Sequence, residues 1–263
     1  MNNLLIMRDV PPALIDTHCH VHEAEYPLDS VETMRRAEAA GVSTVLCVGT
    51  SERSSEEAIA FAEEHDAAFA VVGVHPHDTK DGYGAIVGLA RKKSPKLVAI
   101  GEIGLDYYYG HSPRDVQIRA LESQIQTALD NDLPIVFHVR EAFEDFWPVF
   151  DNFHGIRGEL HSFTDTQVNL DKGFERGLYV GVNGISTFTK DPAQQQLFAN
   201  IPLDRLLLET DAPFLTPTPY RGTINEPAYV SEVARHHASL RGISLQTVAQ
   251  ATTDNATSLF RLK

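Results

Sequence analysis

The chain reads Ala13-Leu-Ile-Asp-Thr-His-Cys-His20, an apolar run that ends in two histidines one residue apart. A short apolar run of this kind is typical of a strand buried in a parallel sheet. Residues i and i+2 of a strand point to the same side, so His18 and His20 can bind one ion together. The competing interpretation is a pair of surface or core histidines. We expect a first strand near residues 13–18 with a candidate metal site at its end.

The same arrangement recurs in four other apolar runs, each of which contains, ends in or precedes an acid or a histidine. In a parallel barrel the carboxyl ends of all strands open onto one face, so we expect these side chains to converge there. Imidazole and carboxylate together suit zinc, manganese or iron, and the sequence therefore predicts a metal-dependent hydrolase. The four runs are Val98-Ala-Ile-Gly-Glu-Ile-Gly-Leu-Asp106 with Glu102, Pro134-Ile-Val-Phe-His-Val-Arg140 with His138, Gly158-Glu-Leu160 followed by His161, and Leu206-Leu-Leu-Glu-Thr-Asp211.

Segments of helical period separate the apolar runs, at intervals of roughly 30 residues. Continuous apolar strands that alternate with helices predict a single-domain (β/α)8 TIM barrel over residues 1–263. An open doubly wound sheet is disfavoured, because no Gly-x-Gly-x-x-Gly follows the first strand and the polar residues are spread over many strands. The expected strands are 13–18, 44–48, 68–74, 97–103, 134–139, 158–161, 178–182 and 205–209, and the expected helices are 30–41, 54–65, 84–93, 113–131, 141–152, 165–176, 191–200, 227–240 and 244–261.

Composition narrows the class of protein and its compartment. The formal net charge of −14 argues against a broad surface for duplex nucleic acid, although bound metal ions would supply positive charge locally. The two cysteines do not form a Cys-x-x-Cys pair, and the first ten residues lack the features of a signal peptide. Apolar stretches fall short of the ~20 residues that span a bilayer. We expect a cytoplasmic protein without a membrane anchor.

Glu102 lies inside an otherwise apolar strand, between Gly101 and Ile103. An isolated buried carboxylate is costly unless it is paired or bound to a metal. The structural alternative is a buried Glu–Arg pair. If two metal ions are present, a carboxylate here is well placed to bridge them. Gly101 and Gly104 flank it, which is consistent with close backbone packing beneath a site.

His138, Arg140, His161 and Asp211 complete the candidate site. Each histidine alone could be an interior residue satisfied by hydrogen bonds, but their shared position at strand ends favours metal binding. Arg140 would clamp an anionic substrate with its planar guanidinium. Water activated at a metal must lose a proton as it attacks. We expect Asp211 to accept this proton and also to be a metal ligand.

Three loop motifs are weaker signals. Pro76 would aim His77 inward toward substrate, although a plain loop histidine is almost as consistent. Asp106 and the rings of Tyr107 to Tyr109 follow Glu102, and those rings could stack on a base or only cover the barrel mouth. Asn225-Glu226-Pro227 reads as a helix start, with Asn225 as N-cap and Pro227 in the first turn.

With these residues in place, the chain resembles the TatD family of metal-dependent deoxyribonucleases in the amidohydrolase superfamily, nearly from end to end. The order and spacing of the shared motifs are more specific than any one of them. Two positions depart from the family pattern, since Asp165 replaces a frequent Gly and Thr223-Ile224 replaces commonly basic residues. The motifs are Ile15-Asp-Thr-His-Cys-His20, Val72-Gly-Val-His-Pro-His77, Gly101-Glu-Ile-Gly-Leu-Asp106, Pro134-Ile-Val-Phe-His-Val-Arg140, His161-Ser-Phe-Thr164, Leu208-Glu-Thr-Asp-Ala-Pro213, Asn225-Glu-Pro-Ala-Tyr229 and residues 255–260.

The resemblance implies a DNase that acts on 3′ ends, a 3′-5′ exonuclease that uses two divalent ions (Mg, Mn or Zn) to activate water. DNA, as single strands or 3′ ends, would be the partner, and the protein would be a monomer or small homo-oligomer. The alternatives are an ester or amide hydrolase such as a D-aminoacyl-tRNA deacylase, and a non-catalytic binding protein. The implied ligands of the first ion are His18, His20, Glu102 and Asp211, those of the second are Glu102, His138 and His161, and the phosphate-binding residues are His77 and Arg140.

Overall fold

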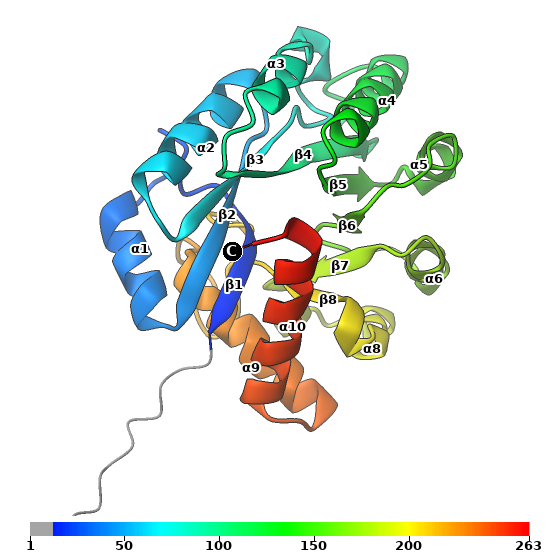
Figure 1. Cartoon of the computed structure of the whole chain (residues 1–263). Coiled ribbons are helices and arrows are strands. Elements are labelled where there is room, and N and C mark those ends of the chain that lie inside the picture. Colours follow the sequence, from blue (N-terminus) through cyan, green and yellow to red (C-terminus); the bar gives the residue numbers. More distant parts are fainter. Residues whose placement is uncertain (1–12, 263) are drawn as a thin grey trace, which may run out of the picture.

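A computed structural model describes residues 13–262 of the chain. In that range eight parallel strands form one sheet whose spatial order follows the sequence, and Figure 1 shows them as a ring with helices outside. The TIM barrel is confirmed, whereas the first ten residues lie outside the described range. The strands are β1 Leu14–Cys19, β2 Val42–Val48, β3 Ala68–Val72, β4 Leu97–Asp106, β5 Ile135–Arg140, β6 Gly158–Leu160, β7 Tyr179–Val182 and β8 Leu206–Leu208.

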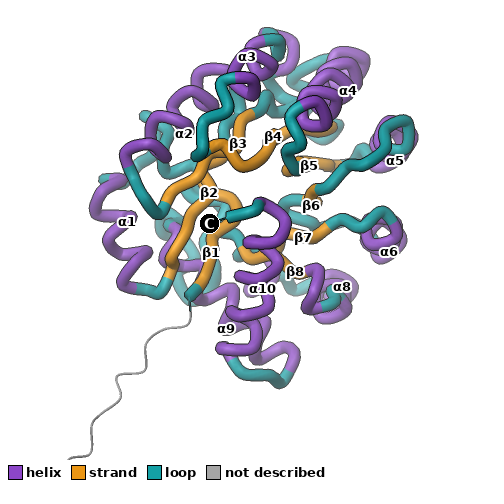
Figure 2. The backbone as a smooth tube through the Cα atoms, in the orientation of Figure 1, coloured by secondary structure: helices purple, strands orange, loops and turns teal. Residues whose placement is uncertain are grey.

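The helices form an outer layer around the strands (Figure 2). No helix within residues 13–262 is both long enough and apolar enough to cross a membrane. The α-helices are α1 Ser30–Ala39, α2 Glu52–Glu64, α3 Ala85–Arg91, α4 Arg114–Asp130, α5 Phe143–Phe150, α6 Gln167–Glu175, α7 Ile185–Phe188, α8 Pro192–Asn200, α9 Val230–Arg241 and α10 Leu245–Phe260, and the 3-10 turns are η1 Thr79–Asp81, η2 Leu203–Arg205 and η3 Pro227–Tyr229.

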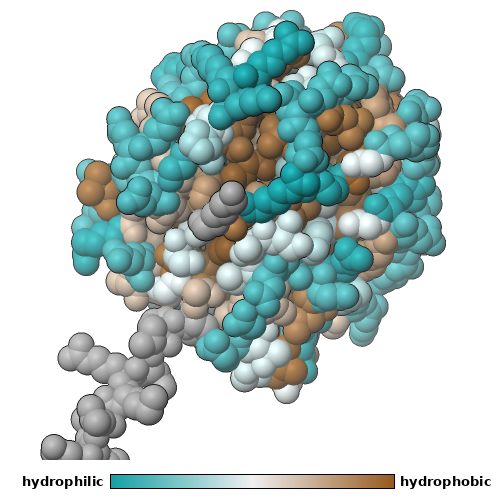
Figure 3. All heavy atoms as spheres, viewed as in Figure 1, coloured by the Kyte–Doolittle hydropathy of each residue, from teal (hydrophilic) through white to brown (hydrophobic). Residues whose placement is uncertain are grey.

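The hydrophobic core has two parts. The larger part fills the space between the strands and the surrounding helices. In the smaller part, apolar strand residues such as Ile15 and Leu207 pack against Leu259 and Phe260 of α10. The hydroxyl of Thr253 in α10 donates to the carbonyl oxygen of Ala13, just before β1, so α10 closes the amino-terminal end of the barrel. On this face hydrophilic atoms dominate the outer helices and hydrophobic atoms show between them (Figure 3).

Backbone hydrogen bonds between β1 and the segment after β8 close the ring at its carboxyl end. The amide of Asp211 donates to the carbonyl oxygen of His18 at 2.8 Å, and the amide of His20 donates to that of Ala212 at 2.8 Å. The side chain of Asp16 accepts from the amide of Thr210 at 2.8 Å and from its hydroxyl at 2.6 Å. The open face of the barrel is therefore the end that carries the candidate metal ligands.

Several element boundaries differ from those expected. Helix α2 begins at Glu52 rather than near residue 54, because the Ser51 hydroxyl accepts the amide of Ser54 and caps the helix earlier. Strand β4 extends to Asp106, where it pairs with Arg140 of β5. The segment expected as a helix over 227–240 is divided into η3 and α9, and the short helix α7 was not expected.

Candidate metal centre

The carboxylate of Glu102 is the centre of a cluster of imidazoles. Its side chain projects from β4 and is almost completely buried. His138 Nδ1 lies 2.7 Å from Oε1, and His161 Nε2 and His75 Nε2 each lie 3.6 Å from the same oxygen. His18 Nε2 lies 3.3 Å from Oε2 on the other side. Glu102 therefore has imidazole neighbours at both of its carboxylate oxygens, as a bridging carboxylate would.

The first group contains His18, His20 and Asp211. His20 Nε2 lies 3.4 Å and His18 Nε2 lies 3.8 Å from Asp211 Oδ1. His20 Nδ1 lies 2.8 Å from the carbonyl oxygen of Val48, so Nδ1 carries the proton and Nε2 presents a lone pair to the cluster. Neither ring nitrogen of the buried His18 has a hydrogen-bond partner among residues 13–262. Because an unpaired buried imidazole is destabilising, His18 is well suited to bind a metal ion.

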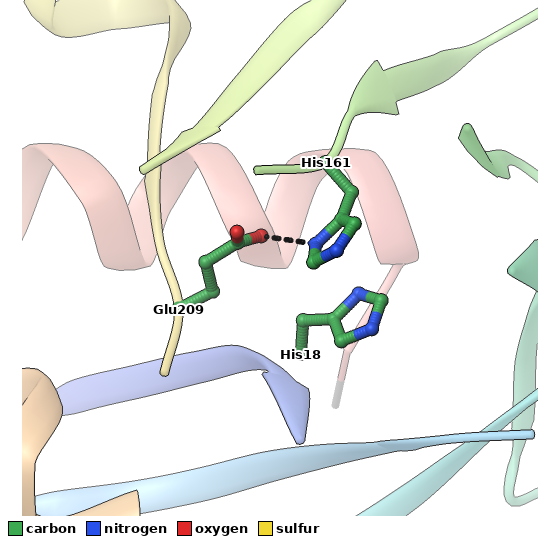
Figure 4. Close-up of side chains that lie close together, drawn as sticks. All are labelled: His18, His161 and Glu209. Atoms are coloured by element: carbon green, nitrogen blue, oxygen red, sulfur yellow. Dashed lines mark hydrogen bonds and ion pairs between the residues drawn. The ribbon is translucent and has the colours of Figure 1, made fainter. Parts of the chain in front are cut away.

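The second group contains His138 and His161, and a carboxylate holds the far nitrogen of each ring. His138 Nε2 lies 3.0 Å from Asp106 Oδ2. His161 Nδ1 lies 3.0 Å from Glu209 Oε2. The ring of His161 stacks on that of His18, with their centroids 3.5 Å apart. Figure 4 shows these three side chains together. Such carboxylate–imidazole pairs orient metal ligands and make them more basic. Both rings therefore present their other nitrogen toward Glu102.

The charges of the cluster are strongly coupled. Burial alone would raise the pKa of the Glu102 carboxyl, but the positive charge of His161 and the hydrogen bond from His138 hold that pKa well below its usual range. Burial lowers the pKa of His18 and of His75, which keeps both rings neutral and their lone pairs available. Burial also opposes protonation of His161, but Glu209 and Glu102 raise its pKa to about 10. Binding of a cation to this cluster would therefore release protons.

The glycines of β4 allow the backbone to pack closely beneath the site. A Cβ atom at Gly101 would lie 2.6 Å from the Cβ of Val136 on β5. A Cβ atom at Gly104 would collide with the carbonyl oxygen of His138. The close packing expected from these glycines is confirmed, and it brings the Glu102 and His138 strands together.

His77 and Arg140 both line a cleft of about 650 Å³ that contains the cluster. His77 Nε2 lies 3.0 Å from Asp106 Oδ2. The Arg140 guanidinium lies over the ring of Tyr108, 3.9 Å from its centroid, and makes no hydrogen bond or ion pair within the described range. The role of both residues in binding phosphate stays a prediction.

The interpretation of Asn225 as a helix cap is wrong. Its side-chain Nδ2 donates to the carbonyl oxygens of Thr210, at 2.8 Å, and Phe214, at 2.5 Å. Asn225 is fully buried and braces the turn that carries Asp211. Pro227 does occupy the first position of η3, as expected.

Two residues of the cluster were not assigned to it from the sequence, although their motifs were noted. His75 contacts Glu102, and Asp106 supports His138. The second His-x-His motif and the acid at the end of β4 were the available signals.

Asp165, which departs from the family pattern, has a local role at the start of α6. Its carboxylate accepts hydrogen bonds from the amide of Thr166 and from the side chain of Asn169 in α6.

Comparison with known proteins identifies the family of this chain. The family described as TatD related DNase matches residues 15–261. The chain belongs to this family. The chain is 36% identical over 253 residues to an uncharacterized metal-dependent hydrolase, YabD of Bacillus subtilis. The aligned region covers 95% of this chain and 99% of YabD.

Other TatD relatives match over nearly their whole length. The protein named 3′-5′ ssDNA/RNA exonuclease TatD from Citrobacter rodentium is 35% identical over 258 residues, covering 94% of this chain and 97% of its own length. The crystal structure of the TatD homologue YjjV from Escherichia coli superposes with a TM-score of 0.89 at 26% identity, covering 95% and 98% of the two chains. The protein is a TatD family metal-dependent hydrolase, and its His/Glu/Asp clusters fit divalent metal ions.

Proposed function

We propose that this TatD family hydrolase is a deoxyribonuclease that removes nucleotides from the 3′ ends of single-stranded DNA with the help of two divalent ions. The observation that carries the proposal is that both carboxylate oxygens of Glu102 face imidazoles, Oε2 at 3.3 Å from His18 and Oε1 at 2.7 Å from His138. Two ions held on either side of one carboxylate are the arrangement that suits displacement at phosphorus. Relatives named as 3′-5′ ssDNA/RNA exonucleases support DNA as the substrate.

Each proposed ligand has a place in this scheme. His18, His20 and Asp211 would hold one ion, His138 and His161 the other, and Glu102 both. Magnesium, manganese or zinc, when bound, would polarise the phosphodiester and lower the pKa of the attacking water.

Asp211 is the proposed general base. It reaches the cleft and keeps a side chain 16% exposed, unlike the fully buried His18. Burial alone would raise the pKa of Asp211, but the adjacent His20, His161 and His18 lower it, so the carboxylate is ionised and able to accept a proton. The guanidinium of Arg140, which has no ion pair among residues 13–262, and the ring of His77 would bind the phosphate oxygens.

The test is the hydrolysis of 5′-labelled single-stranded DNA by metal-stripped protein to which magnesium, manganese or zinc is returned. The proposal predicts a ladder that shortens from the 3′ end and that disappears in Glu102→Gln. Glu159→Gln is the matched control, since Glu159 is an equally buried barrel carboxyl without a hydrogen-bond partner in residues 13–262. Tight metal binding without DNA cleavage would instead favour an ester or amide substrate, such as a D-aminoacyl-tRNA. A cytoplasmic location and a monomer or small homo-oligomer stay predictions.

A further inference from the structure

Three consecutive tyrosines follow β4, and they have different surroundings. Tyr107 is partly buried, donates its hydroxyl to Asp145 at 2.7 Å, and lies under the guanidinium of Arg114. Tyr108 and Tyr109 are each 53% exposed. Tyr107 thus has a structural role, whereas the two following rings contact each other and the Arg140 guanidinium and stay exposed.

Tyr109 forms part of the wall of the cleft that holds the metal cluster. The carboxylate of Asp106 accepts its backbone amide at 3.3 Å, so the residue that supports His138 also fixes this turn. The edge of the His77 ring lies against Tyr109 at a centroid distance of 5.4 Å, and the ring of His111 lies parallel to it at 5.5 Å. The hydroxyl of Tyr109 makes no hydrogen bond to any residue of the range 13–262. Its ring is held in place while much of its surface faces solvent.

Phe214 provides a second exposed ring in the wall of the same cleft. Its side chain is 60% exposed, although phenylalanine is normally buried. Its amide donates to the carbonyl oxygen of Asp211 at 2.8 Å, and its own carbonyl oxygen accepts from Asn225. The turn that positions the proposed general base therefore also holds Phe214 at the mouth of the barrel.

The two rings belong to opposite sides of the barrel. Tyr109 follows β4 and Phe214 follows β8, and these strands are separated by half of the eight-stranded ring. Glu102 lies on β4 and Asp211 lies just after β8, so the metal cluster occupies the space between the two aromatic positions. A ligand whose reacting group lies at the cluster would therefore have one aromatic position on each side.

We propose that Tyr109 and Phe214 stack on the two unpaired nucleobases that flank the scissile phosphodiester. This inference rests on the proposed function and names the part of the substrate that the cleft recognises. Every base has a flat face, so stacking of this kind selects unpaired nucleotides without reading their sequence. The Arg140 guanidinium, held over Tyr108, adds positive charge beside the phosphate on the Tyr109 side. Paired bases at a duplex end stack on each other and cannot separate to opposite walls.

The direct test combines side-chain removal with base removal. Steady-state cleavage is measured for wild type, Tyr109→Ala and Phe214→Ala on single-stranded oligonucleotides whose last two nucleotides carry bases or are tetrahydrofuran abasic units. Each substitution should raise KM roughly tenfold for the normal oligonucleotide, in line with the energy of one base–aromatic stack. It should change KM little for the abasic oligonucleotide, because the contact is already absent. Equal losses on both oligonucleotides would overturn the inference and leave the rings with a structural role.

Two control variants separate the ring from other effects. Tyr109→Phe should retain the wild-type KM, since the stack needs the ring and not the hydroxyl. Tyr220→Ala removes a ring that is 41% exposed, stacks on Tyr229 and does not line the cleft, and it should leave KM unchanged for both oligonucleotides.

A binding measurement distinguishes failure of this inference from failure of the proposed function. Calorimetric titration of the metal-loaded protein compares thymidine 5′-monophosphate with inorganic phosphate. The inference predicts that Tyr109→Ala or Phe214→Ala weakens binding of the nucleotide roughly tenfold and leaves phosphate binding unchanged. That result in a protein without DNase activity would reject only the proposed function. Equal nucleotide affinity in wild type and both variants would reject only the stacking sites.

Discussion

The backbone amide of Asp211 donates a 2.8 Å hydrogen bond to the carbonyl oxygen of His18, and this bond helps to close the barrel. The same two residues are proposed ligands of one metal ion, with His18 Nε2 lying 3.8 Å from Asp211 Oδ1. The two ends of the barrel sheet therefore meet at the metal site. Assembly of the candidate site requires β1 and the segment after β8 to pair, so we expect metal binding and closure of the fold to be coupled.

Metal removal should therefore lower the stability of the whole domain. A ligand present at about 100 times its Kd adds about 2.7 kcal/mol to the free energy of unfolding. We expect Tm, measured by circular dichroism, to fall on treatment with a chelator and to recover when manganese is returned. In Asp211→Ala the stabilisation by manganese should be smaller. A Tm that is insensitive to metal in the wild-type protein would show that closure and metal binding are independent.

Asp106→Asn should weaken metal binding without removing a proposed ligand. The Asp106 carboxylate accepts from His138 Nε2 at 3.0 Å and thereby orients Nδ1 toward Glu102. Loss of such a supporting carboxylate typically lowers metal affinity about 10- to 100-fold. Calorimetric titration with manganese measures the change. Asp145→Asn is the matched control, because Asp145 accepts a 2.7 Å hydrogen bond from Tyr107 and does not line the cleft, and an equal loss in that variant would contradict the account.

Asn225→Ala should reduce both stability and metal affinity. Its amide nitrogen braces the Asp211 turn through two carbonyl oxygens, and leaving such buried groups unpaired costs about 1–3 kcal/mol. Asn255 has the same role at the other end of β8, where its Nδ2 donates to Leu203 at 2.9 Å and to Leu206 at 2.8 Å. Asn255→Ala should lose similar stability in urea unfolding yet retain manganese affinity. If both variants lose affinity alike, Asn225 has no specific role in positioning Asp211.

Much of the fold and of the site was accessible from the sequence because both depend on local patterns. The apolar runs predicted the eight strands, and the acids and histidines at their ends predicted a candidate ligand set whose side chains the structure brings close together.

The errors concern contacts between residues far apart in the sequence. Asn225 looked like a helix cap, but its partner Thr210 lies 15 residues earlier and is brought near it only by the turn after β8. Asp106 is joined to His138, which is 32 residues away, through the register between β4 and β5. A local motif identifies such a residue as polar and does not identify its partner.

Acid should destabilise the metal-free protein in part through His237. Burial, with Arg241 and His236 nearby, lowers the pKa of this ring in α9 to about 3. In the unfolded chain His237 has a pKa near 6.5 and binds a proton more readily than in the folded protein. The neutral ring therefore contributes to the stability of the folded state fully above pH 6.5, and this contribution is lost as pH falls toward 3. The loss approaches about 1.4 kcal/mol per pH unit inside that window.

His237→Gln should therefore make the free energy of unfolding less dependent on pH between 6.5 and 4. The measurement is urea unfolding of both metal-stripped proteins at several pH values. Above pH 7 the free energy of unfolding should change with pH in the same way in wild type and His237→Gln, because the ring is neutral in both the folded and the unfolded state. Parallel curves across the acid range would show that His237 does not contribute.

The most direct test of the account is the number and position of metal ions at Glu102. Crystals of the manganese-loaded protein, examined by anomalous scattering, should show two ions about 3.5–4 Å apart on either side of the Glu102 carboxylate. One should contact His18, His20 and Asp211, and the other His138 and His161. Glu102→Gln should lose at least one of the two. A single ion in the wild-type protein, or two ions that do not share Glu102, would contradict the proposed two-metal centre.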